Sequence, residues 1–256
     1  MPDVTTAASV APSARTDRGP SMNAAIDDAV TEFDLVPRTV GLWLLGGSTS
    51  IVAVATLSGL AIVLADDPDL PLAGALFDLF DLNREGGVAA WWSSMLLMAL
   101  AVSIALVARS RRSKGWWAAA VVAGLMSLDE AVSLHERLSP IVGDLLEGDT
   151  LRTFGWIVPG AIVGVGLAIA AFRLTAELGD PATRWFRVGV VAYLTGAIAF
   201  EVVGALLFDR FGEDAIPYRL SIIAEEGLEM LGAVIMVVAA LTAVAGRRTV
   251  VRVGTD

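Results

Sequence analysis

The sequence contains no cysteine, a single histidine (His135) and a single lysine (Lys114). Without thiolates the chain cannot form structural disulfides, thiolate zinc sites, iron–sulfur clusters or thiolate-ligated haem. One imidazole also excludes bis-histidine haem and a three-histidine zinc site within one chain. Lys114 lies in a basic stretch between two apolar segments, so no mid-span lysine is present to form a retinal Schiff base. We therefore expect no haem, iron–sulfur cluster or retinal.

Charged residues are also scarce. They make up 18% of the chain, whereas 55% of the residues are hydrophobic and the mean hydropathy is +0.69. Soluble domains carry about a quarter charged residues. This composition predicts an all-α polytopic membrane protein, because a lipid-exposed span must satisfy its own backbone hydrogen bonds. The absence of a basic stripe excludes nucleic acid as a partner, and no Walker A, H-E-x-x-H or G-x-S-x-G motif is present.

Six apolar segments follow a polar start, and each is near the roughly 20 residues that cross a bilayer. Residues 1–37, rich in Ala, Ser, Thr and Asp, are predicted to be a disordered cytoplasmic tail. Residues 38–246 are predicted to form one six-helix transmembrane domain, and residues 247–256 a short basic cytoplasmic tail. The predicted spans lie at about 39–65, 88–108, 115–136, 154–174, 186–208 and 219–245.

The basic residues alternate between the two sides of these spans. If both termini are cytoplasmic, 13 of the 18 Lys and Arg residues lie inside and five lie outside. The positive-inside rule therefore predicts N-in, C-in topology, and we expect a multi-pass protein of the plasma (inner) membrane in contact with lipids. The outer loop 66–87 is apolar but too short to span, which predicts a short interfacial helix or a re-entrant segment.

Ionisable residues interrupt three of the apolar segments. Charges at membrane depth are costly, so they need a partner, an ion or a water-filled cavity. Asp129 and Glu201 each lie about 14 residues, or roughly 21 Å of helix, from the inner ends of their segments. The three predicted spans thus carry carboxylates at one level, in the outer half of the membrane. The residues concerned are Asp129, Glu130, His135, Glu136, Glu201, Glu225, Glu226 and Glu229.

Helical periodicity predicts how these side chains face. At 100° per residue Asp129, Ser133 and Glu136 share one face of the third span, and His135 points away from Glu130. On the last span Glu225, Glu226 and Glu229 cover one flank through i,i+3 and i,i+4 spacing. A glycine follows two of the carboxylates in an E-x-x-G pattern, at Gly204 after Glu201 and at Gly232 after Glu229. This spacing places a small residue where a neighbouring helix or a ligand can approach.

Several carboxylates at one depth cannot all be ionised and unpaired, so protons or a cation must accompany them. An oxygen-rich set with one imidazole suits a divalent metal, with Fe, Mn or Zn ahead of Mg or Ca. The chain lacks the E-x-x-H pairs of di-metal helical bundles, so the analogy extends only to ligand type. The predicted metal ligands are Asp129, Glu130, His135, Glu136, Glu201, Glu225, Glu226 and Glu229, and the predicted catalytic groups are Glu130, His135 and Glu201.

Three functions are consistent with these residues. The first is metal-assisted chemistry on a lipid-like or small substrate, with the carboxylates as ligands and proton-transfer groups. The second is a cation or proton-coupled transporter that uses the same carboxylates. The inner halves of the third and fifth spans offer few polar steps, which disfavours a route to the cytoplasm. The third is a non-catalytic assembly or sensor subunit in which the carboxylates connect helices. For His135, Glu136 and Arg137, simple solvation at the interface is an alternative.

Overall fold

The computed structural model describes residues 36–65, 71–84, 86–135, 137, 141 and 155–245, which belong to one compact unit. The predicted tails at 1–35 and 247–256 lie outside the described residues, as do Glu85 and Glu136. Every regular element of the described part is a helix. The elements are α2 (Pro37–Ala65), α3 (Pro71–Phe80), α4 (Val88–Arg111), α5 (Lys114–Val132), α8 (Ile157–Thr175), α9 (Ala182–Leu194), η2 (Thr195–Phe200), α10 (Glu201–Phe211) and α11 (Ile216–Ala245).

Five helices in the described part are long and apolar enough to cross a membrane. They are α2, α4, α8, the continuous helix from α9 through η2 to α10, and α11. Each coincides within a few residues with a predicted span, so the all-α, multi-pass character is confirmed. The predicted helix in the outer loop is also present, as α3.

Helix α5 coincides with the remaining predicted span, but it is not among the five. Its two tryptophans and two carboxylates make it less apolar than the others. It is also shorter than predicted, because Ser133 adopts the left-handed conformation (φ 53°, ψ 50°) and donates its backbone N–H to the Asp129 carbonyl. The prediction that Asp129, Ser133 and Glu136 share a helix face was therefore wrong for Ser133, which lies beyond the helix end. Glu136 lies outside the described residues.

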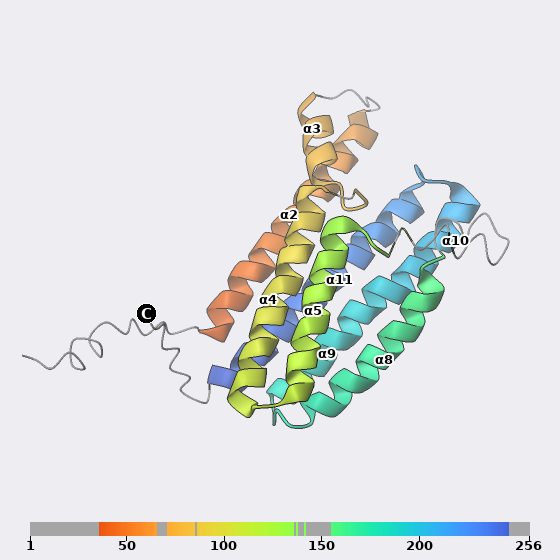
Figure 1. Cartoon of the computed structure of the whole chain (residues 1–256). Helices are drawn as coiled ribbons and strands as arrows, with labels where there is room; N and C mark the ends of the chain where they lie inside the picture. Colours follow the sequence, from red (N-terminus) through yellow and green to blue (C-terminus); the bar gives the residue numbers. More distant parts are fainter. Residues whose placement is uncertain are drawn as a thin grey trace, which may run out of the picture. The chain divides into compact units, whose positions relative to one another are not determined.

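The helices run antiparallel, so their connections gather at two ends of the bundle (Figure 1). At one end α2 begins, α4 passes to α5, α8 passes to α9 and α11 ends. We call it the basic end because eight cationic side chains of the described part lie there. The opposite end, with α3, the C-terminus of α5 and the N-termini of α8 and α11, is the cavity end. The basic end carries Arg38, Arg109, Arg111, Arg112, Lys114, Arg173, Arg184 and Arg187.

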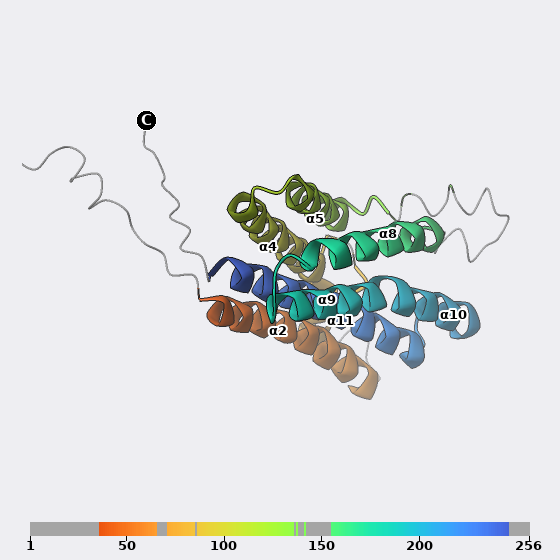
Figure 2. The same ribbon diagram turned by 90° about the horizontal axis from the view of Figure 1, so that it is seen from below.

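Helices α4 and α11 form the interior of the bundle. Leu96, Val107, Met230 and Val237 are each at most 1% exposed, whereas only Gly164 and Thr175 of α8 are buried. Figure 2 shows α4 and α5 as a pair on one side, with α9 beside α11 on the other. The pair is connected by reciprocal hydrogen bonds, because Ser94 and Ser127 each donate to the other's backbone carbonyl at 2.8 Å.

Glycines bring α9 and α11 into backbone contact. A Cβ atom at Gly232 would lie 2.5 Å from the Tyr193 backbone nitrogen and 2.7 Å from the Gly189 carbonyl oxygen. A Cβ at Gly196 would lie 2.6 Å from the Glu225 carbonyl oxygen. Only glycine allows helices to approach this closely, which is a common basis of helix packing in membranes. These contacts fix the line along which the two helices meet.

We expect Gly232→Ala to lower the stability of the protein by about 2 kcal/mol, because the new methyl group meets backbone atoms that cannot move aside. Gly227→Ala is the matched control on α11, since no atom lies within 4 Å of its added Cβ. That variant should gain up to about 1 kcal/mol from the higher helix propensity of alanine. Thermal unfolding of the two variants in detergent measures the difference. Equal stabilities would contradict the close approach.

Candidate functional site

A cavity of about 600 Å³ occupies the cavity end of the bundle. Its walls come from α5, α8, the helix from α9 to α10, and α11, and residues 82–84 line it from the segment after α3. Seven of the eight predicted site residues line it, and the eighth, Glu136, lies outside the described residues. The seven are Asp129, Glu130, His135, Glu201, Glu225, Glu226 and Glu229.

Asp129 and His135 form a pair that the predicted helix phase would not allow. His135 Nδ1 lies 2.8 Å from Asp129 Oδ2, and the His135 backbone N–H donates to Asp129 Oδ1 at 2.9 Å. The pair forms because the chain turns back at Ser133, where α5 ends. The predicted helix phase assumed a helix through residue 136, and for this reason it did not place His135 beside Asp129.

Trp156 connects this pair to Glu201. Its Nε1 donates to Glu201 Oε1 at 2.9 Å, and its ring meets the His135 ring edge-on at a centroid distance of 4.7 Å. A Cβ at Gly160 would lie 2.5 Å from the Trp156 ring, so the glycine leaves the space that the indole occupies. The sequence alone did not indicate that Trp156 connects His135 and Glu201. The available signal was the glycine one turn after a tryptophan at a helix start.

A π-helical turn precedes Glu201. Residues Thr195–Phe200 form η2 within the otherwise α-helical segment from Ala182 to Phe211. A π turn changes the helical phase of the residues after it, and such turns occur often at functional sites. Within η2, Gly196 lies against the Glu225 carbonyl and the Glu229 side chain. The turn therefore sets both the direction of Glu201 and its distance from α11.

The glutamates of α11 face carboxylates and a tyrosine across the cavity. Glu225 lies beside Glu201, and both carboxyls line the cavity. Glu229 lies beside Tyr193, which is buried in α9. Glu130 of α5 lies within electrostatic range of Glu226 and Glu229. The negative charges of three helices thus converge on one space.

Both glycines of the E-x-x-G patterns lie against a neighbouring helix. A Cβ at Gly204 would lie 3.5 Å from Ser221 Oγ of α11, an ordinary contact. Gly232 lies directly against the α9 backbone. A neighbouring helix therefore approaches at both glycines. At Gly204 the cavity is also adjacent, because this residue lines it.

Asn83 and Arg84 form the rim of the cavity after α3. Asn83 lies beside the side chain of Tyr218, and Arg84 donates from Nη1 to the Asp78 carbonyl at 3.3 Å. Among the lining residues of the described part, Arg84 is the one arginine or lysine, opposite six carboxylates. The rim therefore adds little positive charge, and protons or a bound cation must balance the rest.

The donor atoms are not preassembled around a metal position. Within the described ranges, no group of three or more His, Cys, Asp or Glu residues is arranged to hold an ion as it stands. The chemistry of the lining nevertheless matches a hard or borderline cation, since it consists of carboxylate oxygens and one imidazole. Coordination would require rotation of the flexible glutamate side chains.

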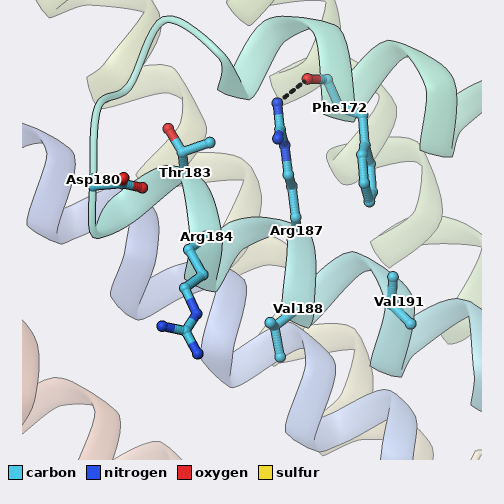
Figure 3. A pocket seen from close by; sticks show the side chains of 7 residues that line it. All are labelled: Phe172, Asp180, Thr183, Arg184, Arg187, Val188 and Val191. Carbon is cyan, nitrogen blue, oxygen red and sulfur yellow. Dashed lines mark hydrogen bonds between the residues drawn. The ribbon is translucent and has the colours of Figure 1, made fainter.

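A second hollow, of about 440 Å³, lies near the basic end between α8 and α9 (Figure 3). Its main feature is Arg187, whose guanidinium donates to the Phe172 carbonyl at 2.7 Å and to Thr175 Oγ1 at 3.1 Å. The same group lies 5.1 Å from the Phe172 ring centroid. These contacts join α8 to α9 and leave the arginine with a structural role, so we place the candidate site in the first cavity.

Comparison with known protein families identifies the family of the chain. Residues 49–244 match the model of a domain of unknown function, DUF8692. The chain belongs to this family. The matched region contains every residue that lines the cavity. Neither the curated proteins nor the solved structures contain a match.

We expect Trp156→Phe to destabilise the protein by about 1–3 kcal/mol, because it removes the donor to a part-buried carboxyl group and keeps the ring contact with His135. Trp117→Phe is the control, since Trp117 is 49% exposed and near the basic end. Thermal unfolding of both variants tests the hydrogen bond. Equal losses would mean that the size of the indole matters and its N–H does not.

Proposed function

We propose that the cavity is a membrane-embedded metal site that carries out metal-assisted chemistry on a lipid-like or small substrate. The observation that supports this most is the convergence of six carboxylates and the only histidine on one open cavity. A set of charges this costly at membrane depth is typical of a functional site. The volume, about 600 Å³, is within the range of small-molecule sites.

The residues that line the cavity would have different roles according to their positions. Glu130, Glu226 and Glu229 belong to helices on opposite sides of the cavity, so together they can surround an ion. Glu201 and Glu225 would supply further oxygen ligands or proton-transfer groups. Asp129 orients the His135 ring, which serves as a ligand or an acid–base group. A bound Fe, Mn or Zn ion, ahead of Mg or Ca, would act there as a Lewis acid.

A cation or proton-coupled transporter is the second candidate. The proximity of Glu201 and Glu225 favours it, because two neighbouring carboxyls can hold a proton between them. A third candidate is an assembly or sensor subunit. Its support is that Trp156 donates to Glu201 and so connects two helices through a carboxylate.

The topology we propose has six spans, with α5 as the third, both termini in the cytoplasm and the cavity at the outer face of the plasma membrane. Two observations support it. The basic residues of the described part are concentrated at the basic end, as the positive-inside rule requires of a cytoplasmic side. In addition, α5 has 19 residues, or about 28 Å of helix, which nearly equals the hydrocarbon thickness.

Elemental analysis of the purified protein tests the metal site. We expect stoichiometric iron, manganese or zinc in the wild type and its loss in Glu201→Gln/Glu229→Gln, because the amides keep the shape and remove two anionic ligands. Glu177→Gln is the control, since this exposed residue lies near the basic end outside the cavity.

The other outcomes separate the alternatives. No metal in the wild type would reject the metal site and favour proton-linked transport. Unchanged metal content in the double variant would place the ion elsewhere. A double variant that only destabilises the protein would favour the assembly subunit.

Because the chain has no cysteine, single thiols can report its topology. We expect a membrane-impermeant maleimide to label Glu213→Cys in intact cells and to label Glu177→Cys only after the cells are opened. Both positions are exposed, one in the turn between α10 and α11 and the other after α8. Labelling of Glu177→Cys in intact cells would contradict the proposed orientation.

A further inference from the structure

The cavity extends along α8 toward the middle of the bundle. Gly160, Val163 and Leu167 of α8 line it one after another. From the start of α8 at Ile157, Val163 is about 9 Å and Leu167 about 15 Å along the helix. In a hydrocarbon core of about 30 Å, the cavity therefore reaches mid-bilayer depth.

One side of the cavity is apolar and another is acidic. Val163 and Leu167 of α8 and Met126 of α5 line the apolar side, whereas Glu201 of α10 and the glutamates of α11 line the acidic side. Glu226 and Glu229 are about 15 and 20 Å along α11 from Ile216, so they reach the depth of Leu167. This division into a polar head region and an apolar tail region is that of an amphiphile.

The cavity is open at its side as well as at its rim. Val163 lines the cavity and is nevertheless 59% exposed, so it borders both the cavity and the outer surface of α8. Helix α5 packs mainly along α4. It meets α8 at the two ends, where Gly115 lies against Leu174 and His135 against Trp156. Between those contacts the opening faces the region that a bilayer fills, because Ile162 and Val163 of α8 are exposed there.

We propose that the cavity takes its substrate from the bilayer, through the opening between α5 and α8. The substrate is an amphiphile whose aliphatic chain lies against Met126, Val163 and Leu167 and whose polar head meets the carboxylates. This inference rests on the proposed function of the cavity as the substrate site and narrows the substrate from lipid-like or small to lipid-like. An aqueous substrate would need only the acidic side and would leave the apolar side without a role.

Two valines of α8 make a matched test. Val163 and Val165 have almost the same exposure, 59% and 58%, but only Val163 lines the cavity. Each is changed to cysteine in the cysteine-free chain, and both variants replace one exposed apolar residue with another of similar size. The rate of reaction with a membrane-permeant maleimide is measured in a neutral glycoside detergent. The probes are dodecylamine and ethylamine, whose positive charge suits the carboxylates and which differ in chain length.

We expect dodecylamine at ten times its dissociation constant to slow labelling of Val163→Cys about tenfold, because only unoccupied protein reacts. Labelling of Val165→Cys should not change. Ethylamine at the same concentration should not protect either thiol, since it has the charge and lacks the chain.

Three results would overturn the proposal. Equal protection of both thiols by dodecylamine would indicate a general coating of α8. Equal protection by ethylamine would indicate a site for the head alone. A failure of dodecylamine to protect Val163→Cys would leave the aliphatic chain without a binding site.

The outcome is independent of the metal measurement. Protection of Val163→Cys in a protein that holds no metal would keep the amphiphile site and reject the metal site. Stoichiometric metal without protection would do the reverse.

Discussion

The backbone contact between α9 and α11 is the constraint on which the rest of the site depends. Gly189, Gly196 and Gly232 let the two helices meet without intervening side chains. That contact holds Tyr193 beside Glu229 and Glu201 beside Glu225. With side chains between the helices, these pairs would separate and the cavity would lose its acidic wall. Packing residues with no chemistry of their own thus determine where the chemical groups meet.

The helices and the carboxylates that line the cavity could be predicted from the sequence. Long apolar segments form helices in lipid whatever their partners are, so the spans were predicted within a few residues. The carboxylates were identifiable because Glu201 and Glu225 are costly in such segments. Two features depended on the third dimension and were missed. The turn at Ser133, which returns His135 to Asp129, requires a left-handed residue that is uncommon outside glycine and asparagine. The role of Trp156 depends on helices that are distant in sequence.

The π turn at η2 was a third feature that helical periodicity could not supply. Face assignments assume 100° per residue from one end of a helix to the other, and a π turn breaks that assumption for everything after Phe200. The predicted depth of Glu201 was therefore a better guide to its position than a predicted helix face. The predicted metal site depends on more than the depth and the face of a helix residue. A set of ligands also depends on side-chain rotamers, and in the described part the rotamers leave the donor atoms apart.

The serine pair between α4 and α5 has a consequence for the cavity. Ser94 and Ser127 join α5 to α4, while the cavity separates α5 from α11. The acidic space therefore has one wall built on the glycine contacts of α9 and α11, and another, with Glu130, that is joined to the bundle through α4. The position of Glu130 in the cavity thus depends on a contact between two serines that do not line it.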